Sequence, residues 1–394
     1  MGHVDPALPT AIILHPNDGA LTAARVLAAR GVRVHALGDG SVGAPFIRSR
    51  AVTGHRLPDL PDGVDAWVDR LEAIAGDGPG VMLSGSDHAT RFLYSHRGAI
   101  PAVLRSFESS DGPHARVLDK SSLYATAEAA GVRTPRTERA TTPAQLEAAA
   151  GRVTYPCVLK PANIHYGEIA GQKTKPVESA AEVLEHGTQA VEAGLEMLLS
   201  ELVPGPESNL EGAVTVRLAD GSFPLAYGRR KLRQWPLDYG AAALMVAEEV
   251  PETMALARTL LEACGFVGVS SLETKRHALT GEVVLIEINV RLPQSFGLSK
   301  ACGVEGPWRV YAALAGLPLG PQPPVRTGTK VVMPPLERRA ATARIRRGEL
   351  TVRGLLRSYR GVRSVGLLNP SDPLPAVAFA LQGARGRLAR MRGR

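Results

Sequence analysis

Residues 283–297, VVLIEINVRLPQSFG, contain the pattern that decides the fold. Six of the first eight residues are apolar, which predicts a strand packed into a core. The same stretch carries Glu287, Asn289 and Arg291 at every second position. Because alternate residues of a strand point to the same face, we expect these three polar groups side by side. A polar face on a buried strand predicts a bound ligand or a polar partner.

The preceding strand supplies a second acid. Residues 267–277, VGVSSLETKRH, are typical of a strand, and residues 279–281 fit a three-residue hairpin loop with Gly in the left-handed position. In that register Glu273 lies directly opposite Glu287. Two facing carboxylates repel each other and raise each other's pKa unless a cation lies between them.

Glu273, Glu287 and Asn289 form a set of hard oxygen ligands. Such a set suits Mg²⁺, which keeps its remaining coordination positions for water and phosphate. The alternative interpretation is one exposed glutamate and one salt bridge to Lys275 or Arg291. The hairpin predicts a magnesium site, with this alternative left open.

The composition places the protein among ordinary globular enzymes and binding proteins. The chain has 394 residues, 44% of them apolar, which is enough for two or three domains. No apolar run reaches the ~18 residues of a membrane helix, and the first residues, MGHVDPALPT, lack the features of a secretory signal. Cys157, Cys264 and Cys302 are widely spaced and form no metal or redox pattern. We expect a cytoplasmic protein with no membrane partner.

Positive charge is concentrated near the C-terminal end. Residues 338–394 contain fourteen Arg and two acids, Glu349 and Asp372, which gives a net charge of +12 against −4 for the rest of the chain. Such a segment can bind nucleic acid or an anionic membrane. It has almost no aromatic side chains to stack on bases, however. We favour a solvated, Arg-rich surface over nucleic-acid binding.

The first third of the chain alternates between strands and helices. Residues 11–15, 32–37 and 81–85 are predicted strands, with helical segments between them, which indicates a parallel sheet covered by helices. Ligands bind such sheets beyond the C-terminal ends of the strands, where HPNDG (15–19) and SGSD (84–87) lie. Neither is a GxGxxG loop, so the sequence gives no support for a dinucleotide site.

Five motifs occur along the chain in a fixed order. They are DK at 119–120, YPCVLKP at 155–161, SELVPGPE at 200–207, GRRKLRQWP at 228–236 and EINVR at 287–291. Together they resemble the motifs of the ATP-grasp superfamily, in particular carboxylate–amine ligases of the D-aspartate ligase type. The most specific of them is EINVR, which is similar to the Glu-x-Asn-x-Arg strand of that family.

The resemblance implies an α/β protein with an α+β ATP-grasp fold. Residues 1–117 would form a parallel-sheet domain that precedes the ATP-grasp fold. Residues 118–203 would form the small ATP-grasp subdomain, and residues 204–322 the central subdomain with the metal hairpin. Residues 323–394 would form a small basic C-terminal extension.

The resemblance also implies a nucleotide site. Two lysines would contact the phosphates of ATP as compact charges. One backbone segment would bind adenine, with its glutamate near the amino group, and a further acid would bind the ribose hydroxyls. The expected nucleotide-binding residues are Lys120, Lys160, Glu201, Leu202, Val203 and Glu207.

Metal and catalytic groups follow from the same resemblance. Glu273, Glu287 and Asn289 would hold one or two Mg²⁺, with Mn²⁺ as an alternative. The remaining cations would act on the γ-phosphate, the acyl phosphate or a substrate carboxylate. These candidate catalytic residues are Lys231, Arg233 and Arg291, with Arg291 ranked first.

Residues 162–175, ANIHYGEIAGQKTK, fit the place of a lid over the γ-phosphate. Many family members have a glycine-rich loop here, whereas this segment has two glycines, so its contact with phosphate is in question. His165 is a candidate base on this lid, and Tyr166, Trp235 and Tyr239 are candidates for lining the acceptor pocket.

The implied activity is ATP-dependent ligation of a carboxylate to an amine through an acyl phosphate, with release of ADP and phosphate. Amino acids are the expected small-molecule substrates, and a homodimer is an open expectation. Two alternatives remain. One is an ATP-grasp enzyme with another acceptor, a carboxylase or a kinase. The other is a non-catalytic nucleotide-binding module whose basic tail binds nucleic acid or membrane.

Overall fold

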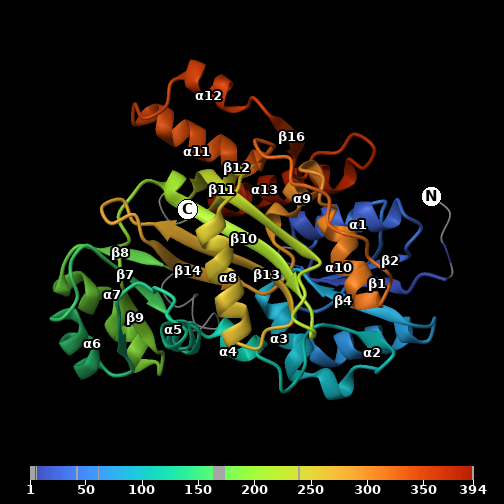
Figure 1. Ribbon diagram of the computed structural model, residues 1–394, viewed down its shortest axis with the longest axis horizontal. Helices are drawn as coiled ribbons and strands as arrows, with labels where there is room; N and C mark the ends of the chain where they lie inside the picture. The colour runs from blue at the N-terminus through green and yellow to red at the C-terminus, as the bar shows by residue number, and fades with distance from the viewer. Residues whose placement is uncertain are drawn as a thin grey trace.

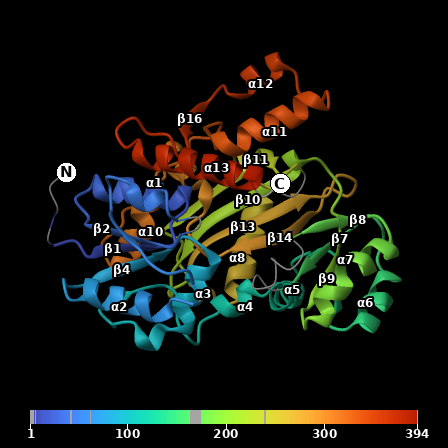
Figure 2. The same cartoon turned by 180° about the vertical axis from the view of Figure 1, so that it is seen from behind.

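The fold is built on three β-sheets, shown by the computed structural model in Figure 1. The N-terminal sheet and a four-stranded sheet lie at opposite ends of a central seven-stranded sheet, as Figures 1 and 2 both show. The structure describes residues 5, 7–40, 43–60, 62–162, 174–237 and 240–392.

The N-terminal sheet is parallel, as the strand–helix alternation predicts. Its strand order is β3-β2-β1-β4-β5, so the order changes direction between β1 and β4. Buried Ile, Leu and Val side chains on both faces pack against helices, as expected for a parallel sheet. The strands are β1 (Thr10–Leu14), β2 (Val34–Gly38), β3 (Thr53–Arg56), β4 (Gly80–Ser84) and β5 (Leu104–Arg105). The helices of this part are α1 (Asp18–Ala28), η1 (Phe46–Arg48), α2 (Val64–Ala75), α3 (Asp87–Ser95) and η2 (Arg97–Ala99).

The four-stranded sheet is antiparallel, in the order β6-β9-β7-β8. Leu146 and Val183, from two helices, pack on Leu159 and Leu199 of the sheet, which leaves the other face for the cleft described below. The elements are β6 (Thr137–Ala140), α6 (Pro143–Ala150), β7 (Cys157–Pro161), β8 (Lys175–Val177), α7 (Ala180–Glu192) and β9 (Met197–Glu201).

The central sheet has the order β14-β13-β10-β11-β12-β15-β16 and is antiparallel except for the last pair. One face is covered by helices whose core includes Leu123, Leu260 and Phe266. The strands are β10 (Leu210–Arg217), β11 (Leu225–Trp235), β12 (Ala241–Ala247), β13 (Gly268–Arg276), β14 (Val283–Asn289), β15 (Lys330–Val332) and β16 (Val362–Val365). The covering helices are α4 (His114–Leu118), α5 (Lys120–Ala129) and α8 (Pro251–Ala263), and η4 (Glu207–Asn209) precedes β10.

One apolar core joins the N-terminal sheet to the central sheet. Phe296 and Tyr311, which follow β14 in the chain, pack in one cluster with Leu27 of α1 and Tyr227 of β11. The hairpin that carries the two acids is thereby held against the N-terminal domain. The connecting helices are η5 (Gln294–Phe296), α9 (Gly297–Ala301) and α10 (Gly306–Ala315).

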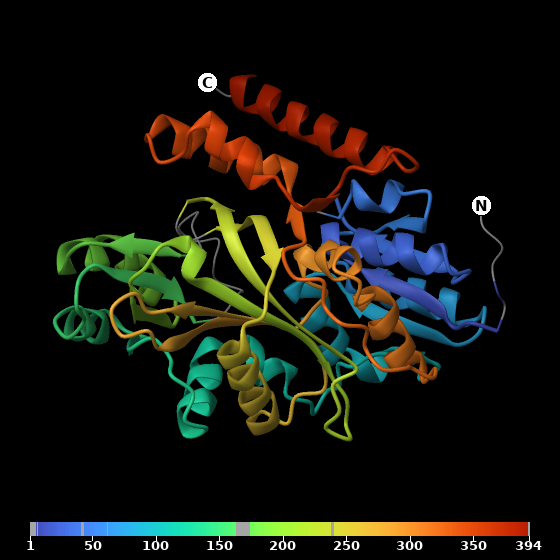
Figure 3. The same ribbon diagram turned by 45° about the horizontal axis from the view of Figure 1, so that its top comes forward.

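The C-terminal residues are an integral part of the central sheet. Strand β15 pairs with β12 and β16 pairs with β15, so the linker-like PQPP at 321–324 leads back into the sheet. The helices α11 (Pro334–Arg346), α12 (Val352–Ser358) and α13 (Leu374–Arg392) lie on one side of the molecule, as Figures 1 and 3 show. Among the described residues, none of the helices is long and apolar enough to span a membrane.

Candidate active site

The hairpin of β13 and β14 brings the two acids together as predicted. Glu273 pairs with Glu287, and Ser271 pairs with Asn289. The predicted loop is wrong by one residue, because the backbone N of His277 donates to the carbonyl of Glu282 at 2.8 Å. A bulge next to Glu273 shifts the register back by one residue and restores the facing pair.

Glu273 already has cationic neighbours. Its Oε1 accepts a hydrogen bond from Lys231 Nζ at 2.8 Å, and both side chains are buried. Arg229 Nη2 lies 3.7 Å from Oε2 of the same carboxylate. Gly212 on the neighbouring strand makes room for this guanidinium, since a Cβ there would lie 3.0 Å from Arg229 Cζ. The repulsion expected between the two acids is therefore offset at Glu273.

Glu287 lies at the base of a cleft, where solvent reaches its side chain although protein surrounds it on several sides. Asn289 Nδ2 donates to Glu287 Oε1 at 3.1 Å, and Asn289 Oδ1 accepts from Arg291 Nη2 at 2.8 Å. Partial burial acts to raise the pKa of Glu287, but Lys231, the Asn289 amide, Lys120 and Arg291 together hold it below its usual value. The carboxylate is thus kept charged.

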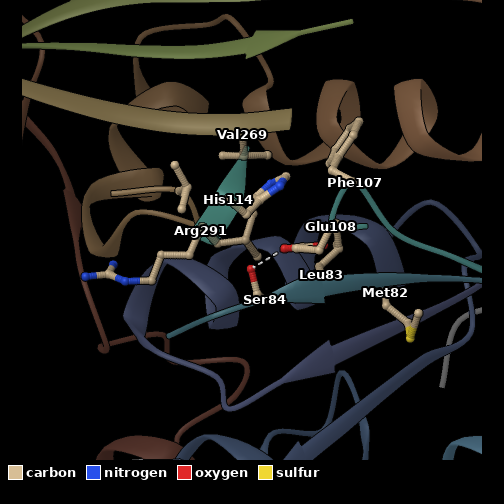
Figure 4. A pocket seen from close by; sticks show the side chains of 10 residues that line it. Met82, Leu83, Ser84, Phe107, Glu108, His114, Val269 and Arg291 are labelled. Atoms are coloured by element: carbon tan, nitrogen blue, oxygen red, sulfur yellow. Dashed lines mark hydrogen bonds between the residues drawn. The ribbon is translucent and has the colours of Figure 1, made fainter. Parts of the chain in front are cut away.

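The side chain of Arg291 is held in place by a residue of the N-terminal domain. Its Nε donates to Oδ1 of Asp87, the first residue of α3, at 2.9 Å. Figure 4 shows the Arg291 guanidinium pointing away from a small cavity lined by Ser84 and Glu108. There the Ser84 hydroxyl donates to Glu108 Oε1 at 2.9 Å. Burial in this cavity raises the pKa of Glu108 to about 7, partly offset by hydrogen bonds from the Glu108 backbone, Ser84 and Ser106 and by Arg97.

The two predicted phosphate lysines are close to each other. Lys120 begins α5, and Lys160 lies on β7, where its Nζ donates to Tyr124 Oη at 3.0 Å. Burial lowers the pKa of Lys160 to about 8, although Glu287 acts in the opposite direction. Burial and the neighbouring charge of Lys160 lower the pKa of Lys120 as well. Two half-buried ammonium groups held this way indicate a site for an anion.

Two cavities meet at the acid pair. One, of about 450 Å³, is lined by all six predicted nucleotide-binding residues. The other, of about 360 Å³, is lined by Asp87, Arg229 and Arg291. Both volumes lie in the range of small-molecule sites. Residues that line both cavities are Lys120, Thr174, Lys231, Gly240, Glu273 and Glu287.

The predicted adenine and ribose residues line the first cavity, and two of their side chains are already engaged. Glu201 Oε2 accepts hydrogen bonds from Arg133 Nη2 at 3.1 Å and from the backbone N of Arg136 at 3.0 Å. Glu207 Oε1 lies 2.6 Å from Arg344 Nη2, on a side chain that is only 5% exposed. The prediction that adenine binds here therefore rests on the backbone of Glu201 to Val203, because the Glu201 carboxylate is directed toward Arg133.

Arg233 is not brought to the acid pair. In the part of the chain that the structure describes, it lines neither cavity, and its Nε donates to Glu337 Oε1 at 2.8 Å. The register of β11 shifts between Lys231 and Arg233, so the alternation of faces breaks at this point. Gln234 takes the cleft-facing position instead.

Sequence reasoning missed two groups in the second cavity. Arg229 could have been found from period-two alternation, because it lies two residues before Lys231 on the same strand. Asp87 belongs to the SGSD segment at the end of a strand, but its pairing with Arg291 could not be read from the sequence. The lid candidates His165 and Tyr166, and Tyr239, lie outside the described residues.

Comparisons with known proteins identify the architecture. No protein-family model and no curated protein matches the chain. A crystal structure of N5-carboxyaminoimidazole ribonucleotide synthetase with ADP has a TM-score of 0.64 and 18% identity, covering 83% of this chain and 82% of that one. The L-amino acid ligase of Bacillus licheniformis has a TM-score of 0.57 and 16% identity, covering 78% of this chain and 74% of that one. The chain has the ATP-grasp fold.

A third match concerns part of a larger enzyme. Pyruvate carboxylase of Rhizobium etli has a TM-score of 0.60 and 14% identity, covering 80% of this chain and 30% of that one. The fold that the five motifs implied is thereby confirmed. At such identities the likeness concerns the architecture, so the chemistry rests on this chain's own residues.

The acids of this ATP-grasp fold fit a magnesium ion. Among the described residues, no group of three or more His, Cys, Asp or Glu side chains is arranged to hold a metal. Mg²⁺ in nucleotide sites needs only one or two carboxylates, because phosphate and water complete its shell. Glu273 and Glu287 face each other at the border of the two cavities, and Asn289 lies beside them. The donor set is therefore sufficient.

Proposed function

We propose that this protein is an ATP-dependent ligase that joins a carboxylate to an amine through an acyl phosphate. The main support is the position of the Glu273–Glu287 pair. It lies between a cavity lined by Lys120 and Lys160 and a cavity lined by Arg229 and Arg291. One side suits a nucleotide and the other an anionic substrate. Similar folds occur in a synthetase bound to ADP and in an L-amino acid ligase, which supports the proposal.

The nucleotide would occupy the larger cavity. Lys120 and Lys160 would contact its phosphates, and contact with an anion would restore the charge that burial disfavours. The backbone of Glu201, Leu202 and Val203 would bind adenine. Glu207 would bind the ribose hydroxyls, because this residue lines the same cavity.

Glu273, Glu287 and Asn289 would hold one or two Mg²⁺, or Mn²⁺, against the phosphates. When bound, the metal supplies positive charge that lets an anionic carboxylate approach the γ-phosphate. Lys231 and Arg291 add two further cations at the same border. Asp87 holds Arg291 in place, so little reorganisation of this guanidinium is needed as charge develops. Lys231 starts from its ion pair with Glu273 and would turn toward the phosphate.

The proposed chemistry begins with the substrate carboxylate, which is a poor electrophile. Its oxygen attacks the γ-phosphorus, ADP leaves, and the acyl phosphate carries a good leaving group. A neutral amine then attacks the acyl carbon, the C–O bond to phosphate breaks, and the amine nitrogen loses a proton to the departing phosphate as the amide forms. Lys231 and Arg291 stabilise the transferred phosphoryl group through both steps.

Amino acids are the proposed substrate class. The second cavity combines cationic groups with apolar walls formed by Ala241, Ala242 and Met245, of which the two alanines are small. The cations suit a carboxylate, and the small walls suit a short aliphatic side chain. The wall residues would set substrate size rather than reactivity.

A carboxylase is the second candidate. Two proteins of similar fold are named as an N5-carboxyaminoimidazole ribonucleotide synthetase and a pyruvate carboxylase. In that case bicarbonate would take the place of the organic carboxylate. ADP release that needs bicarbonate and no organic carboxylate would favour this candidate over the ligase.

The proposal is tested by a screen of amino-acid pairs for ADP release, followed by mass analysis of the products. On the best pair, ¹⁸O placed in the donor carboxylate is expected to appear in the released phosphate, because the acyl phosphate passes this oxygen on. Amide formation without labelled phosphate would exclude an acyl phosphate. ADP release without an amide product would exclude the ligase.

A further inference from the structure

The C-terminal extension, residues 323–394, is anchored to two other parts of the molecule. Strand β15 pairs with β12 of the central sheet. At the other end, Asp372 Oδ2 accepts hydrogen bonds from Arg25 Nε at 2.8 Å and from Ser49 Oγ at 2.6 Å in the N-terminal domain. Asp372 is 5% exposed, so this contact is buried. The extension therefore has a fixed position beside the cleft.

A buried ion pair sets the direction of α11. Glu337, which is 3% exposed, accepts from Arg233 Nε at 2.8 Å and from Tyr359 Oη at 3.1 Å. A buried carboxylate needs such partners, because an unpaired charge would be costly. The pair ties the first turn of α11 to β11, and the helix then runs toward the nucleotide cavity.

The last turn of α11 brings an arginine to Glu207, which lines the nucleotide cavity. Arg344 Nη2 lies 2.6 Å from Oε1 of Glu207, and Arg344 Nη1 donates to Glu349 Oε2 at 2.7 Å. Gly348 adopts a left-handed conformation with φ of 73°, and the backbone N of Glu349 donates to the carbonyl of Arg344 at 2.9 Å. This helix end folds Glu349 back on Arg344 and holds the guanidinium in place.

We propose that Arg344 is a positioning residue for nucleotide recognition, which orients the Glu207 carboxylate toward the ribose hydroxyls. The inference rests on the proposed function, in which Glu207 binds ribose. A buried carboxylate that is paired with a fixed guanidinium stays charged and keeps one orientation. A charged acceptor makes stronger hydrogen bonds to hydroxyl groups than a neutral one. The basic extension thus completes the nucleotide site.

The test measures binding of a non-hydrolysable ATP analogue and its 2′-deoxy form by calorimetry. Wild-type protein is compared with Arg344→Ala, Arg344→Lys and Glu207→Gln, and Arg346→Ala serves as the control. Arg346 lies on the exposed surface of the same helix, so its removal changes the net charge equally. We expect Arg344→Ala to weaken binding of the ribonucleotide about tenfold, because the ribose would lose a well-oriented hydrogen bond to the charged Glu207 carboxylate. The preference for the ribonucleotide over its 2′-deoxy form should also fall. Arg344→Lys should retain part of the affinity and part of the preference.

A double variant separates positioning from general damage. If Arg344 acts through Glu207, adding Arg344→Ala to Glu207→Gln should weaken binding little further. If Arg344→Ala fails to fold, Glu349→Gln loosens the same guanidinium and should shift the ribose preference in the same direction. Unchanged affinity and preference in a folded variant, or additive effects in the double variant, would overturn the inference. Absence of ligase activity would contradict the proposed function. The binding result could still be interpreted, because nucleotide binding requires no turnover.

Discussion

Lys231 and Glu273 form a buried ion pair with Nζ and Oε1 2.8 Å apart, at the border of the two cavities. Lys231 and the proposed metal would share the Glu273 carboxylate. With a metal held by Glu273, the Lys231 ammonium would be free to contact a phosphate oxygen. The pair therefore links metal binding to the position of a cation that acts on the transferred group.

Replacement of Lys231 by Met should reveal this link. Glu273 would be left as a buried charge without its closest partner, at a cost of about 3–5 kcal/mol in the free energy of unfolding. Mg²⁺ alone should recover part of that loss by taking the place of the ammonium. The measurement is thermal unfolding of wild type and variant with and without Mg²⁺. Equal stabilisation of both proteins by the metal would contradict the link.

Replacement of Glu287 by Ala should abolish ADP formation and leave the fold intact. The side chain is exposed in the cleft, so its loss removes a ligand and opens no core cavity. We expect a fall in rate of at least about 100-fold, as for other losses of transition-state charge stabilisation. Glu282→Ala, at an exposed acid of the hairpin loop, is the matched control. Full ADP formation in the Glu287 variant would exclude this site.

Nucleotide affinity should fall as the pH rises through about 8. The pKa of Lys160 is lowered to about 8 by burial, so its ammonium loses its proton in this range and with it the attraction to phosphate. In Lys160→Arg the guanidinium stays charged, so the decline should be much smaller. Titration of an ATP analogue at several pH values tests this. A parallel decline in both proteins would assign the titration to another group.

Glu108 should make the wild-type protein less stable as the pH rises. Its pKa in the folded protein, about 7, lies above the 4.5 of an ordinary glutamate, so the folded state binds the extra proton. Between about pH 4.5 and 7 the free energy of unfolding falls relative to Glu108→Gln, by up to roughly 3 kcal/mol, and above pH 7 the difference stays constant. Urea unfolding of both proteins measures it. A difference independent of pH would show that Glu108 does not titrate in this range.

The acid pair could be predicted from the sequence because side chains alternate strictly along a strand. In addition, the short loop between the two strands allows only a few hairpin registers. The predicted three-residue loop was wrong, and a bulge beside Glu273 compensated for the error. The parallel N-terminal sheet followed from the alternation of strands and helices. Local sequence patterns were thus sufficient to predict the N-terminal sheet and the acid pair of the site.

Other features depend on contacts that the sequence does not show. The resemblance grouped Arg233 with Lys231 and Arg291 as candidate catalytic cations, and the register shift in β11 turns Arg233 away from the cleft. The contact between Arg344 and Glu207 joins segments far apart in the chain. Most described arginines of the extension are exposed, as composition indicated, but composition could not show that its strands β15 and β16 join the central sheet.

A crystal structure with a non-hydrolysable ATP analogue and Mn²⁺ tests the central claim most directly, because the anomalous signal of manganese locates the metal. The account predicts manganese bound by Glu273 and Glu287, phosphates on Lys120 and Lys160, and Lys231 moved from the carboxylate toward phosphate. Nucleotide bound outside the cleft, or metal held by other residues while Lys231 still pairs with Glu273, would contradict it.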